Sequence, residues 1–291
     1  MFTGCMTALV TPFSAGNVDH RALADLVEMQ VAGRVQALVP CGSTGEAATL
    51  THDEQAEVVR AVVKLARKRV PVIAGSGSNS TAEAIRLTRA AEEAGADAAL
   101  LISPYYNKPT QEGIYRHYAA VAEATRLPLI VYNIPGRTAS NLTPETIGRL
   151  SAIKNVVGVK EASGSLPQVI EIIEASAPEF AVYAGDDIMT VPIMAVGGKG
   201  VISVTANVMP REMAELAEAL LENDLERGRT LMHRLLPLVN AVVGLEVNPI
   251  PVKTALALMG RCAEEFRLPL TCMTAAGRTR LESVLREYDL V

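Results

Sequence analysis

The sequence has few of the side chains that bind metals or form cross-links. Its 291 residues include four cysteines and four histidines, with no CxxC pair and no HxxxH spacing. The cysteines are scattered along the chain, at Cys5, Cys41, Cys262 and Cys272. This pattern argues against a structural zinc site and against a disulfide framework. We therefore interpret the cysteines as small buried hydrophobic residues.

The sequence also lacks an excess of positive charge and a membrane span. Twenty-seven Lys and Arg against 32 Asp and Glu residues give a net charge of −5, which argues against a nucleic-acid partner. The uncharged stretches Ile188–Gly198 and Gly200–Pro210 contain proline and fall short of the roughly 18–20 apolar residues of a span. The segment Met1–Cys5 lacks the basic and apolar regions of a signal peptide, so we expect a cytosolic protein.

The composition is that of a globular protein with a large core. Hydrophobic residues make up 49% and charged residues 20% of the chain, and the mean hydropathy is +0.22. Glycine and proline are near average usage, which argues against collagen-like and low-complexity chains. The length allows either two domains or one of the larger α/β barrels.

Short β-branched apolar runs alternate with amphipathic stretches to about residue 205. The runs are Met6–Thr11, Ala37–Pro40, Val70–Ala74, Ala98–Ile102, Leu129–Asn133, Val156–Val159, Ala181–Ala184 and Gly200–Val204. The intervening helical segments are His20–Gly33, Thr51–Lys68, Thr81–Gly95, Gln111–Thr125, Pro144–Leu150, Ser165–Ala175 and Ile188–Gly197. Strands without polar alternation that are joined by helices indicate a parallel sheet covered on both faces. Eight such units favour a (β/α)₈ barrel over an open sheet.

Strand signals stop after residue 205, and four more helices are predicted. These are Arg211–Asn223, Asp224–Val243, Pro251–Glu265 and Thr274–Tyr288. We therefore predict a barrel domain over residues 1–223 and a helical C-terminal region over residues 224–291.

Reactive side chains follow several of the predicted strands, at the end where barrel enzymes place their active sites. They are Ser43, Thr44, Tyr105, Tyr106, Tyr132, Arg137 and Lys160, and the backbone of Gly185 follows another of these strands. Strand alternation puts Val156, Gly158 and Lys160 on one face and Val157, Val159 and Glu161 on the other. Glu161 is then expected to face the helices, and Lys160 the barrel interior without an obvious carboxylate partner.

A buried lysine without a counter-charge has a lowered pKa, which frees its neutral amine to attack a ketone and form an imine. Tyr132, predicted at the same height on the preceding strand, could shuttle protons in such a reaction. Each residue also has a plainer interpretation. Lys160 could extend to solvent, Tyr132 could be packing, Ser43 and Thr44 could be turn residues, and Arg137 could be a solvated loop residue.

A glycine-rich segment, Gly75–Ser80, follows a predicted strand and precedes a helix. It lacks the third glycine of a dinucleotide-binding fingerprint, and Asp97 precedes its strand rather than ending it. We expect no nicotinamide cofactor.

Five segments together resemble the dihydrodipicolinate synthase family, over essentially the whole chain. They are Gly42–Glu46, Ser103–Pro109, Tyr132–Thr138, Gly158–Ala162 and Asn248–Lys253. The resemblance implies a Schiff base between Lys160 and pyruvate, followed by addition of the resulting enamine to L-aspartate-4-semialdehyde. It also implies a homotetramer of tight dimers and neither a metal nor an organic cofactor.

The resemblance also assigns roles to individual positions. Tyr132, Ser43 and Tyr106 match proton-relay hydroxyls, with Tyr106 supplied by the partner subunit. Thr44 matches the residue that binds the pyruvate carboxylate, and Arg137 the one that binds the carboxylate of the aldehyde substrate. Gly185 and Ile202 are expected to line the pocket with their backbones.

Two sets of relatives remain as alternatives. Ser43 stands where threonine is usual in the family, and N-acetylneuraminate lyases also carry Ser-Thr there, although their pattern lacks Arg137. Aldolases and dehydratases for 2-keto-3-deoxy sugar acids share the lysine and the tyrosine, and so differ in the second substrate. From another class, a barrel that binds a keto acid without turnover would not need Lys160 aligned with Tyr132.

The resemblance finally points to a site for L-lysine, the pathway product, in a cleft across the tight dimer interface. The matching positions are Ala47, Ala48, His52, Asn79, Glu83 and Tyr105. Two departures, Ala47 for a frequent serine and Gln55 for a histidine, lead us to expect only partial inhibition. On sequence alone, Glu83 could equally be a first-turn acid of its helix and His52 a solvated residue near a cap.

Overall fold

The protein is described here by a computed structural model that covers residues 2–291. Within this range, eight parallel strands form one sheet in the order β4-β1-β10-β9-β8-β7-β6-β5. The strands are β1 (Gly4–Ala8), β4 (Ala37–Val39), β5 (Ile73–Gly75), β6 (Ala98–Ile102), β7 (Leu129–Asn133), β8 (Val156–Glu161), β9 (Ala181–Ala184) and β10 (Gly200–Ser203). The predicted (β/α)₈ barrel is thus confirmed.

The two end strands of this sheet, β4 and β5, meet and nearly close the barrel. Leu38 forms an isolated parallel bridge with Val72, and the Leu38 amide donates to the Pro71 carbonyl at 3.0 Å. The Gly75 amide donates to the Pro40 carbonyl at 2.9 Å. A Cβ at Gly75 would lie 2.0 Å from the Cys41 oxygen, so only glycine permits this approach.

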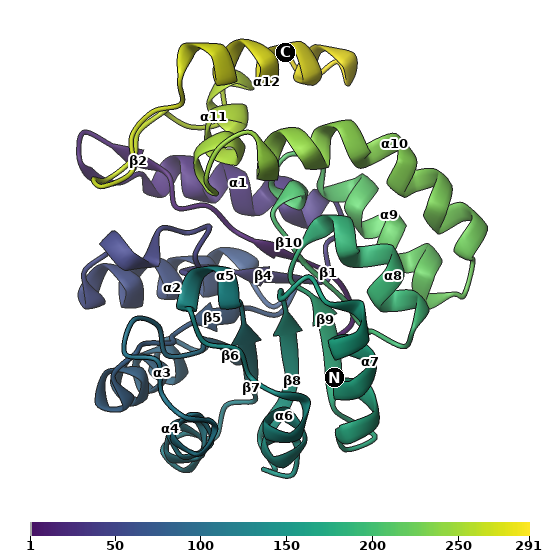
Figure 1. The fold of residues 1–291 in the computed structure, drawn as a ribbon. Helices are drawn as coiled ribbons and strands as arrows, with labels where there is room; N and C mark the ends of the chain where they lie inside the picture. The colour runs from purple at the N-terminus through teal and green to yellow at the C-terminus, as the bar shows by residue number, and fades with distance from the viewer. Residues whose placement is uncertain (1) are drawn as a thin grey trace.

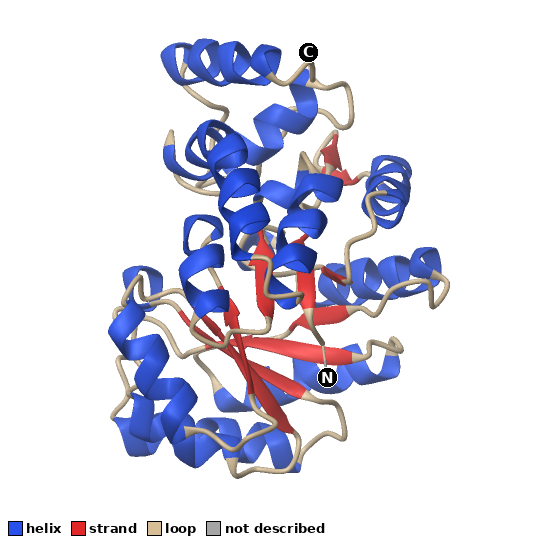
Figure 2. Cartoon of the chain, turned by 90° about the vertical axis from the view of Figure 1, so that its right-hand side faces the viewer, coloured by secondary structure: helices blue, strands red, loops and turns tan. Residues whose placement is uncertain are grey.

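Helices surround the barrel and continue into a C-terminal bundle (Figure 2). They are α1 (His20–Ala32), α2 (His52–Ala66), α3 (Thr81–Glu93), α4 (Gln111–Glu123), α5 (Pro135–Thr138), α6 (Pro144–Ser151), α7 (Leu166–Ala175), α8 (Thr190–Ala195), α9 (Pro210–Leu221), α10 (Leu225–Gly244), α11 (Ile250–Leu258) and α12 (Ala275–Glu287). Short polar side chains cap many of their N-termini, as Thr51, Ser80 and Thr110 do for α2, α3 and α4.

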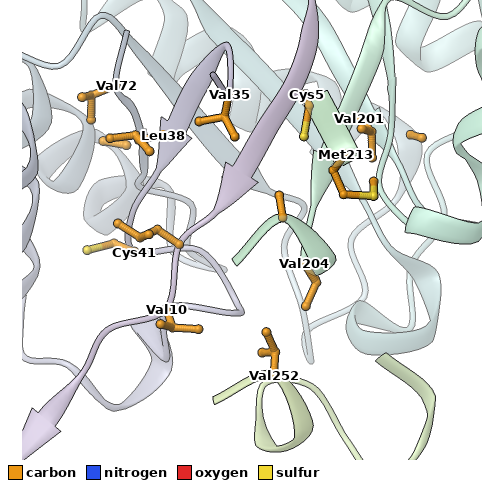
Figure 3. Close-up of a cluster of buried hydrophobic side chains, with 14 of the residues drawn as sticks. Cys5, Val10, Val35, Leu38, Cys41, Val72, Val201, Val204, Met213 and Val252 are labelled. Carbon is orange, nitrogen blue, oxygen red and sulfur yellow. The ribbon is translucent and has the colours of Figure 1, made fainter. Parts of the chain in front are cut away.

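Side chains alternate between two hydrophobic clusters along the strands. The inner cluster fills the barrel and consists of Met6, Ala8, Ala37, Val39, Ile73, Ala98, Leu100, Ile130, Tyr132, Ala181, Tyr183 and Ile202. The outer cluster joins the strands to the helices (Figure 3). Because the interior is packed with side chains, substrate can enter only at a barrel mouth.

The structure corrects several predicted boundaries. A two-stranded hairpin of β2 (Phe13–Ser14) and β3 (Asn17–Val18) follows β1, which ends at Ala8 rather than Thr11. The helix predicted over Pro251–Glu265 ends at Leu258, where Gly260 adopts a positive φ of 69°. Short α5 was not predicted, and the segment predicted as Ile188–Gly197 contains a 3₁₀ turn, Asp187–Met189, followed by α8.

Helices α10 to α12 lie at the end of the barrel toward which β7 and β8 point (Figure 1). Val252 of α11 belongs to the same buried cluster as Val10 and Val204 (Figure 3). The division at residues 223 and 224 falls in the turn between α9 and α10, and we keep it as a proposal. No helix in residues 2–291 is long and apolar enough to cross a bilayer.

Candidate active site

Lys160 and Tyr132 lie side by side near the carboxyl ends of two adjacent strands. The Cα partners in the β7–β8 ladder include Tyr132 with Lys160, and Lys160 pairs in turn with Tyr183 of β9. Both tyrosines belong to the inner cluster, so Lys160 also projects into the barrel. Its Nζ lies 4.3 Å from the centroid of the Tyr132 ring, and the residue is only 5% exposed.

Burial lowers the pKa of Lys160 to about 8, and the carboxylates of Asp187 and Asp186 act in the opposite direction. The positive charge of Arg137 helps to lower this pKa. At pH 8 about half of the amine is therefore neutral and nucleophilic, compared with well under 1% for a solvated lysine. Two carboxylates thus act on Lys160, but desolvation outweighs them.

Glu161 faces away from the barrel interior, as predicted. One carboxylate oxygen accepts from Asn133 Nδ2 at 2.9 Å, and the other accepts from the Ser163 amide at 2.7 Å. One part of the predicted alternation is wrong, because Val156 belongs to the outer cluster and Val157 packs against the inner one. A register irregularity in the β7–β8 ladder, between Leu129 and Ile130, accompanies this change of face.

Tyr132 is 5% exposed, and burial raises the pKa of its phenol to about 12. A hydrogen bond with Ser43 and the charge of Arg137 oppose this rise. The phenol is therefore protonated at neutral pH. A neutral hydroxyl in contact with a second hydroxyl can pass a proton in either direction.

The Gly42–Glu46 loop that carries Ser43 and Thr44 follows β4 and is tightly turned. The Gly45 amide donates to the Gly42 carbonyl at 3.1 Å, and the Glu46 amide donates to the Ser43 carbonyl at 3.2 Å. Thr11 Oγ1 donates to the Gly45 carbonyl at 2.7 Å. This loop therefore has a fixed position above the barrel.

Asn248, between α10 and α11, joins two of the predicted binding residues. Its Nδ2 donates to Thr44 Oγ1 at 3.0 Å, and its carbonyl accepts from Arg137 Nη2 at 2.9 Å. Asn248 begins one of the five segments that carry the family resemblance, but nothing in the sequence pattern indicates its role. Its contacts depend on the fold, because Asn248 is 204 residues away from Thr44 in the sequence.

Arg137 lies on α5, immediately after β7, and its side chain is exposed. It lines the same cavity as Ser43 and Tyr132. An exposed guanidinium at the mouth of this cavity can bind the carboxylate of an entering molecule through two parallel hydrogen bonds.

Gly185 borders Lys160 from just after β9, and Ile202 of β10 faces the barrel interior one strand further on. The Gly185 amide donates to the Glu161 carbonyl at 2.8 Å, and a Cβ at Gly185 would lie 3.1 Å from Lys160 Cγ. Ile202 is 1% exposed and belongs to the inner cluster. Tyr183 was missed by the sequence reasoning, although its inward position on β9 follows from alternation with Ala181.

A cavity of about 510 Å³ begins at Tyr132 and Arg137 and extends to α2 and α3. Its far part is lined by most of the predicted lysine-binding residues: Ala47, Ala48, His52, Glu83 and Tyr105. His52 Nε2 lies 2.9 Å from Glu83 Oε1, and Asn79 Nδ2 donates to the Tyr105 carbonyl at 3.1 Å. The fold therefore brings all six predicted positions together.

Tyr106 is the predicted site residue that the fold leaves outside the site. It is 88% exposed and adopts a φ of 72°, which is uncommon for a bulky residue. Among the described residues, no group of three or more His, Cys, Asp or Glu side chains could hold a metal ion. The polar groups that the fold brings together at this site include an amine, hydroxyl groups and a guanidinium.

The chain is similar to known proteins over its whole length. Residues 1–288 match the family described as the dihydrodipicolinate synthetase family. Over 291 residues, the full length of both chains, the sequence is 53% identical to the 4-hydroxy-tetrahydrodipicolinate synthase of Geobacter metallireducens.

Three solved structures have the same fold. Dihydrodipicolinate synthase from Aquifex aeolicus is 46% identical, with 99% of each chain covered and a TM-score of 0.98. The enzyme from Acinetobacter baumannii, complexed with pyruvate, is 44% identical, with full coverage of both chains and a TM-score of 0.98. The enzyme from Cyanidioschyzon merolae, with lysine bound, is 40% identical, with 100% and 99% covered and a TM-score of 0.96.

Proposed function

The chain belongs to the dihydrodipicolinate synthetase family and is a lyase of lysine biosynthesis with 4-hydroxy-tetrahydrodipicolinate synthase activity, and we propose that its reaction proceeds through a Schiff base between Lys160 and pyruvate. One observation carries this proposal: a buried amine with a pKa of about 8 lies in register beside a buried phenol. That pair has the nucleophile and the proton donor of imine chemistry.

In the proposed reaction, the neutral Lys160 amine attacks the ketone carbon of pyruvate and forms a C–N bond. The ketone oxygen takes up protons and leaves as water, which gives the imine. Loss of a methyl proton then gives an enamine, whose carbon adds to the aldehyde of L-aspartate-4-semialdehyde. The amine of the second substrate attacks the imine carbon, closes the ring and releases the Lys160 amine.

The proposed proton relay consists of hydroxyl groups. Tyr132 lies next to Lys160 and is hydrogen-bonded to Ser43, so this pair can deliver protons to the ketone oxygen and remove them from the adduct. Thr44 is proposed to bind the pyruvate carboxylate, and Gly185 and Ile202 to border the adduct. Arg137 is proposed to bind the carboxylate of the aldehyde substrate.

An assay with different second substrates tests the proposed reaction. We expect turnover when pyruvate and L-aspartate-4-semialdehyde are supplied together, and no comparable cleavage of N-acetylneuraminate or 2-keto-3-deoxygluconate. Preferred cleavage of either sugar acid would instead assign the site to a related aldolase. Binding of pyruvate without turnover of any of these substrates would indicate a keto-acid-binding barrel.

We also propose that the active form is a homotetramer of tight dimers in which Tyr106 completes the relay of the partner subunit. An exposed phenol held at a positive φ supports this, because backbone strain is concentrated at functional sites and this phenol is too exposed to belong to the site of its own subunit. The expected cytosolic location stays a prediction.

Activity is accordingly expected to depend on assembly. Dilution to a concentration at which sedimentation velocity shows monomers should lower the specific activity, and Tyr106→Phe should lower turnover while the oligomer persists. A fully active monomer at nanomolar concentration would contradict the assignment of Tyr106.

The far part of the 510 Å³ cavity is proposed to bind L-lysine as an inhibitor. Glu83 can accept a hydrogen bond from the ammonium group of an amino acid, and His52 offers a polar partner near its carboxylate. Within this chain, Glu83 already contacts His52 and Ser78, so it is held in place before any ligand enters.

We expect partial inhibition by lysine at saturating pyruvate, and Glu83→Ala should raise the half-inhibiting concentration about 10-fold or more. The readout is the ratio of inhibited to uninhibited rate for each variant. Glu57→Ala is a matched control, because it removes a similar His–Glu pair, with His20 at 3.0 Å, that lies outside the cavity lining. Absence of inhibition at millimolar lysine would mean that these residues serve only as packing.

A further inference from the structure

A buried ion pair joins the Gly42–Glu46 loop to the C-terminal helical region. Lys253 Nζ, on α11, lies 2.6 Å from Glu46 Oε1, and both side chains are completely buried. The ammonium also lies over two aromatic rings, at 4.0 Å from the centroid of Phe13 and 5.1 Å from that of Phe266.

The second carboxylate oxygen of Glu46 is also engaged by the C-terminal region. It accepts a hydrogen bond from the Arg267 backbone amide at 3.3 Å. Both oxygens are thus held by residues more than 200 positions away in the sequence, 207 for Lys253 and 221 for Arg267. The Glu46 carboxylate can reach both hydrogen-bond donors in only one position, so two different segments of the C-terminal region fix its place.

The Glu46–Lys253 pair is not expected to add much to the free energy of unfolding. Desolvating two charges costs several kcal/mol per ion, and apolar side chains of similar volume in such positions are often as stable or more so. Burial lowers the pKa of Lys253, which reflects this penalty, although the charge of Glu46 opposes it. Unlike apolar packing, a buried ion pair fixes the relative position of its two side chains, because its hydrogen bond forms in only one geometry.

That geometry is imposed on a strained residue next to the proposed binding site. Glu46 has a φ of 54°, in the left-handed region that costs a non-glycine residue free energy. Its amide closes the turn to Ser43, and its carbonyl accepts from the Thr49 amide at 3.0 Å. A change in the Glu46 position must therefore move Ser43 and Thr44 with it.

We propose that Glu46 and Lys253 are positioning residues, which use the C-terminal helical region to hold Ser43 and Thr44 at the height of the Lys160–pyruvate adduct. α11 is a firm support for this purpose, because Val252, next to Lys253, is packed in the buried cluster (Figure 3). Asn248 reinforces the same link through Thr44. The inference rests on the proposed function of Lys160 and Thr44.

The test replaces the pair by apolar side chains of similar size, E46L/K253M. Removing both charges leaves no charge buried without a partner, and the partly buried Arg267 amide loses only a long hydrogen bond of 3.3 Å, so the melting temperature should stay close to the native value. The pyruvate concentration that gives half-maximal borohydride trapping at Lys160 should rise about 10-fold or more, the scale for a misplaced hydrogen bond to a carboxylate. A structural role alone would not change this concentration in folded protein.

E46Q is the second variant, since it keeps the shape of the side chain but removes its charge and one of its two acceptor oxygens, which weakens its links to Lys253 and to the Arg267 amide. We expect a smaller rise in the half-saturating pyruvate concentration than in the double variant. E54Q is the matched control, because Glu54 joins α2 to the same C-terminal segment through Arg267 Nη2 at 2.6 Å and Nη1 at 2.7 Å. It should lower the melting temperature and leave pyruvate binding unchanged.

Native half-saturation in folded E46L/K253M would overturn the inference. If the double variant does not fold, E46Q decides: a raised half-saturating concentration supports the inference, and a native one overturns it. An equal rise in E54Q would also overturn it, since any loosening of the C-terminal region would then suffice. If the unmutated protein traps no pyruvate, the proposed function itself fails.

Discussion

Lys160→Ala is expected to abolish pyruvate trapping by borohydride and to lower turnover by about 10⁴-fold or more, the scale for loss of a covalent nucleophile. The reason is that Lys160 carries the amine that forms the proposed imine, and alanine has no atom that can replace it. Circular dichroism should show a folded protein, because the loss of the buried methylene groups of Lys160 is offset by removal of the cost of burying its amine.

Lys154→Ala is the matched control for this variant. Lys154 is an exposed lysine just before β8, the strand that carries Lys160, at its other end. Its loss should change neither trapping nor turnover. Trapping that persists in Lys160→Ala, with the label on Lys108, Lys154 or Lys199, would refute the assignment of Lys160.

Arg137→Ala is expected to lower kcat/KM for L-aspartate-4-semialdehyde by about 30- to 1000-fold, which corresponds to about 2–4 kcal/mol for a lost charge-assisted contact. Trapping of pyruvate should largely survive, because the Arg137 side chain is exposed, whereas Lys160 is only 5% exposed and projects into the barrel. Steady-state kinetics with the aldehyde, and trapping without it, measure the two effects separately.

Arg149→Ala serves as a control for general loss of positive charge. Arg149 is on α6, pairs with Glu112 at 2.9 Å and stacks on Tyr115, away from the cavity lining. It should leave both readouts near native. Unchanged kinetics with the aldehyde in Arg137→Ala would contradict the role of Arg137 in choosing the second substrate.

The elements of the barrel were predictable because local patterns specify them. Three strands, β6, β7 and β9, have the predicted bounds, since each is a short apolar run flanked by turn or loop residues. The inward direction of Lys160 and Tyr132 also follows from alternation along each strand. Confirmation came from the pairing of these two residues across β7 and β8.

The β7–β8 register shows the limit of this local reasoning. Leu129 pairs with Val156, but Ile130 pairs with Gly158, so the ladder shifts by one residue before it reaches the site. Strict alternation assigned Val156 to the wrong face for this reason. Gly158, the first residue paired after the shift, is of a type often found at bulges, but the pattern alone does not locate the shift, because it depends on how two strands from different parts of the chain fit together.

Contacts between residues far apart in the sequence could not be predicted from local patterns either. Asn248 binds Thr44 across 204 positions, and Lys253 binds Glu46 across 207. A lysine in an apolar helix and a glutamate after a glycine turn carry no sign of each other in the sequence. Their association appears only when α11 is placed over the barrel mouth.

The most direct measurement of the central claim is the site of covalent attachment in the unmutated protein. The protein is incubated with pyruvate, reduced with borohydride, digested and analysed by mass spectrometry. The account predicts one added reduced-pyruvate mass on the peptide that contains Lys160, and its loss when borohydride is omitted. An added mass on another lysine, or no added mass at saturating pyruvate, would contradict it.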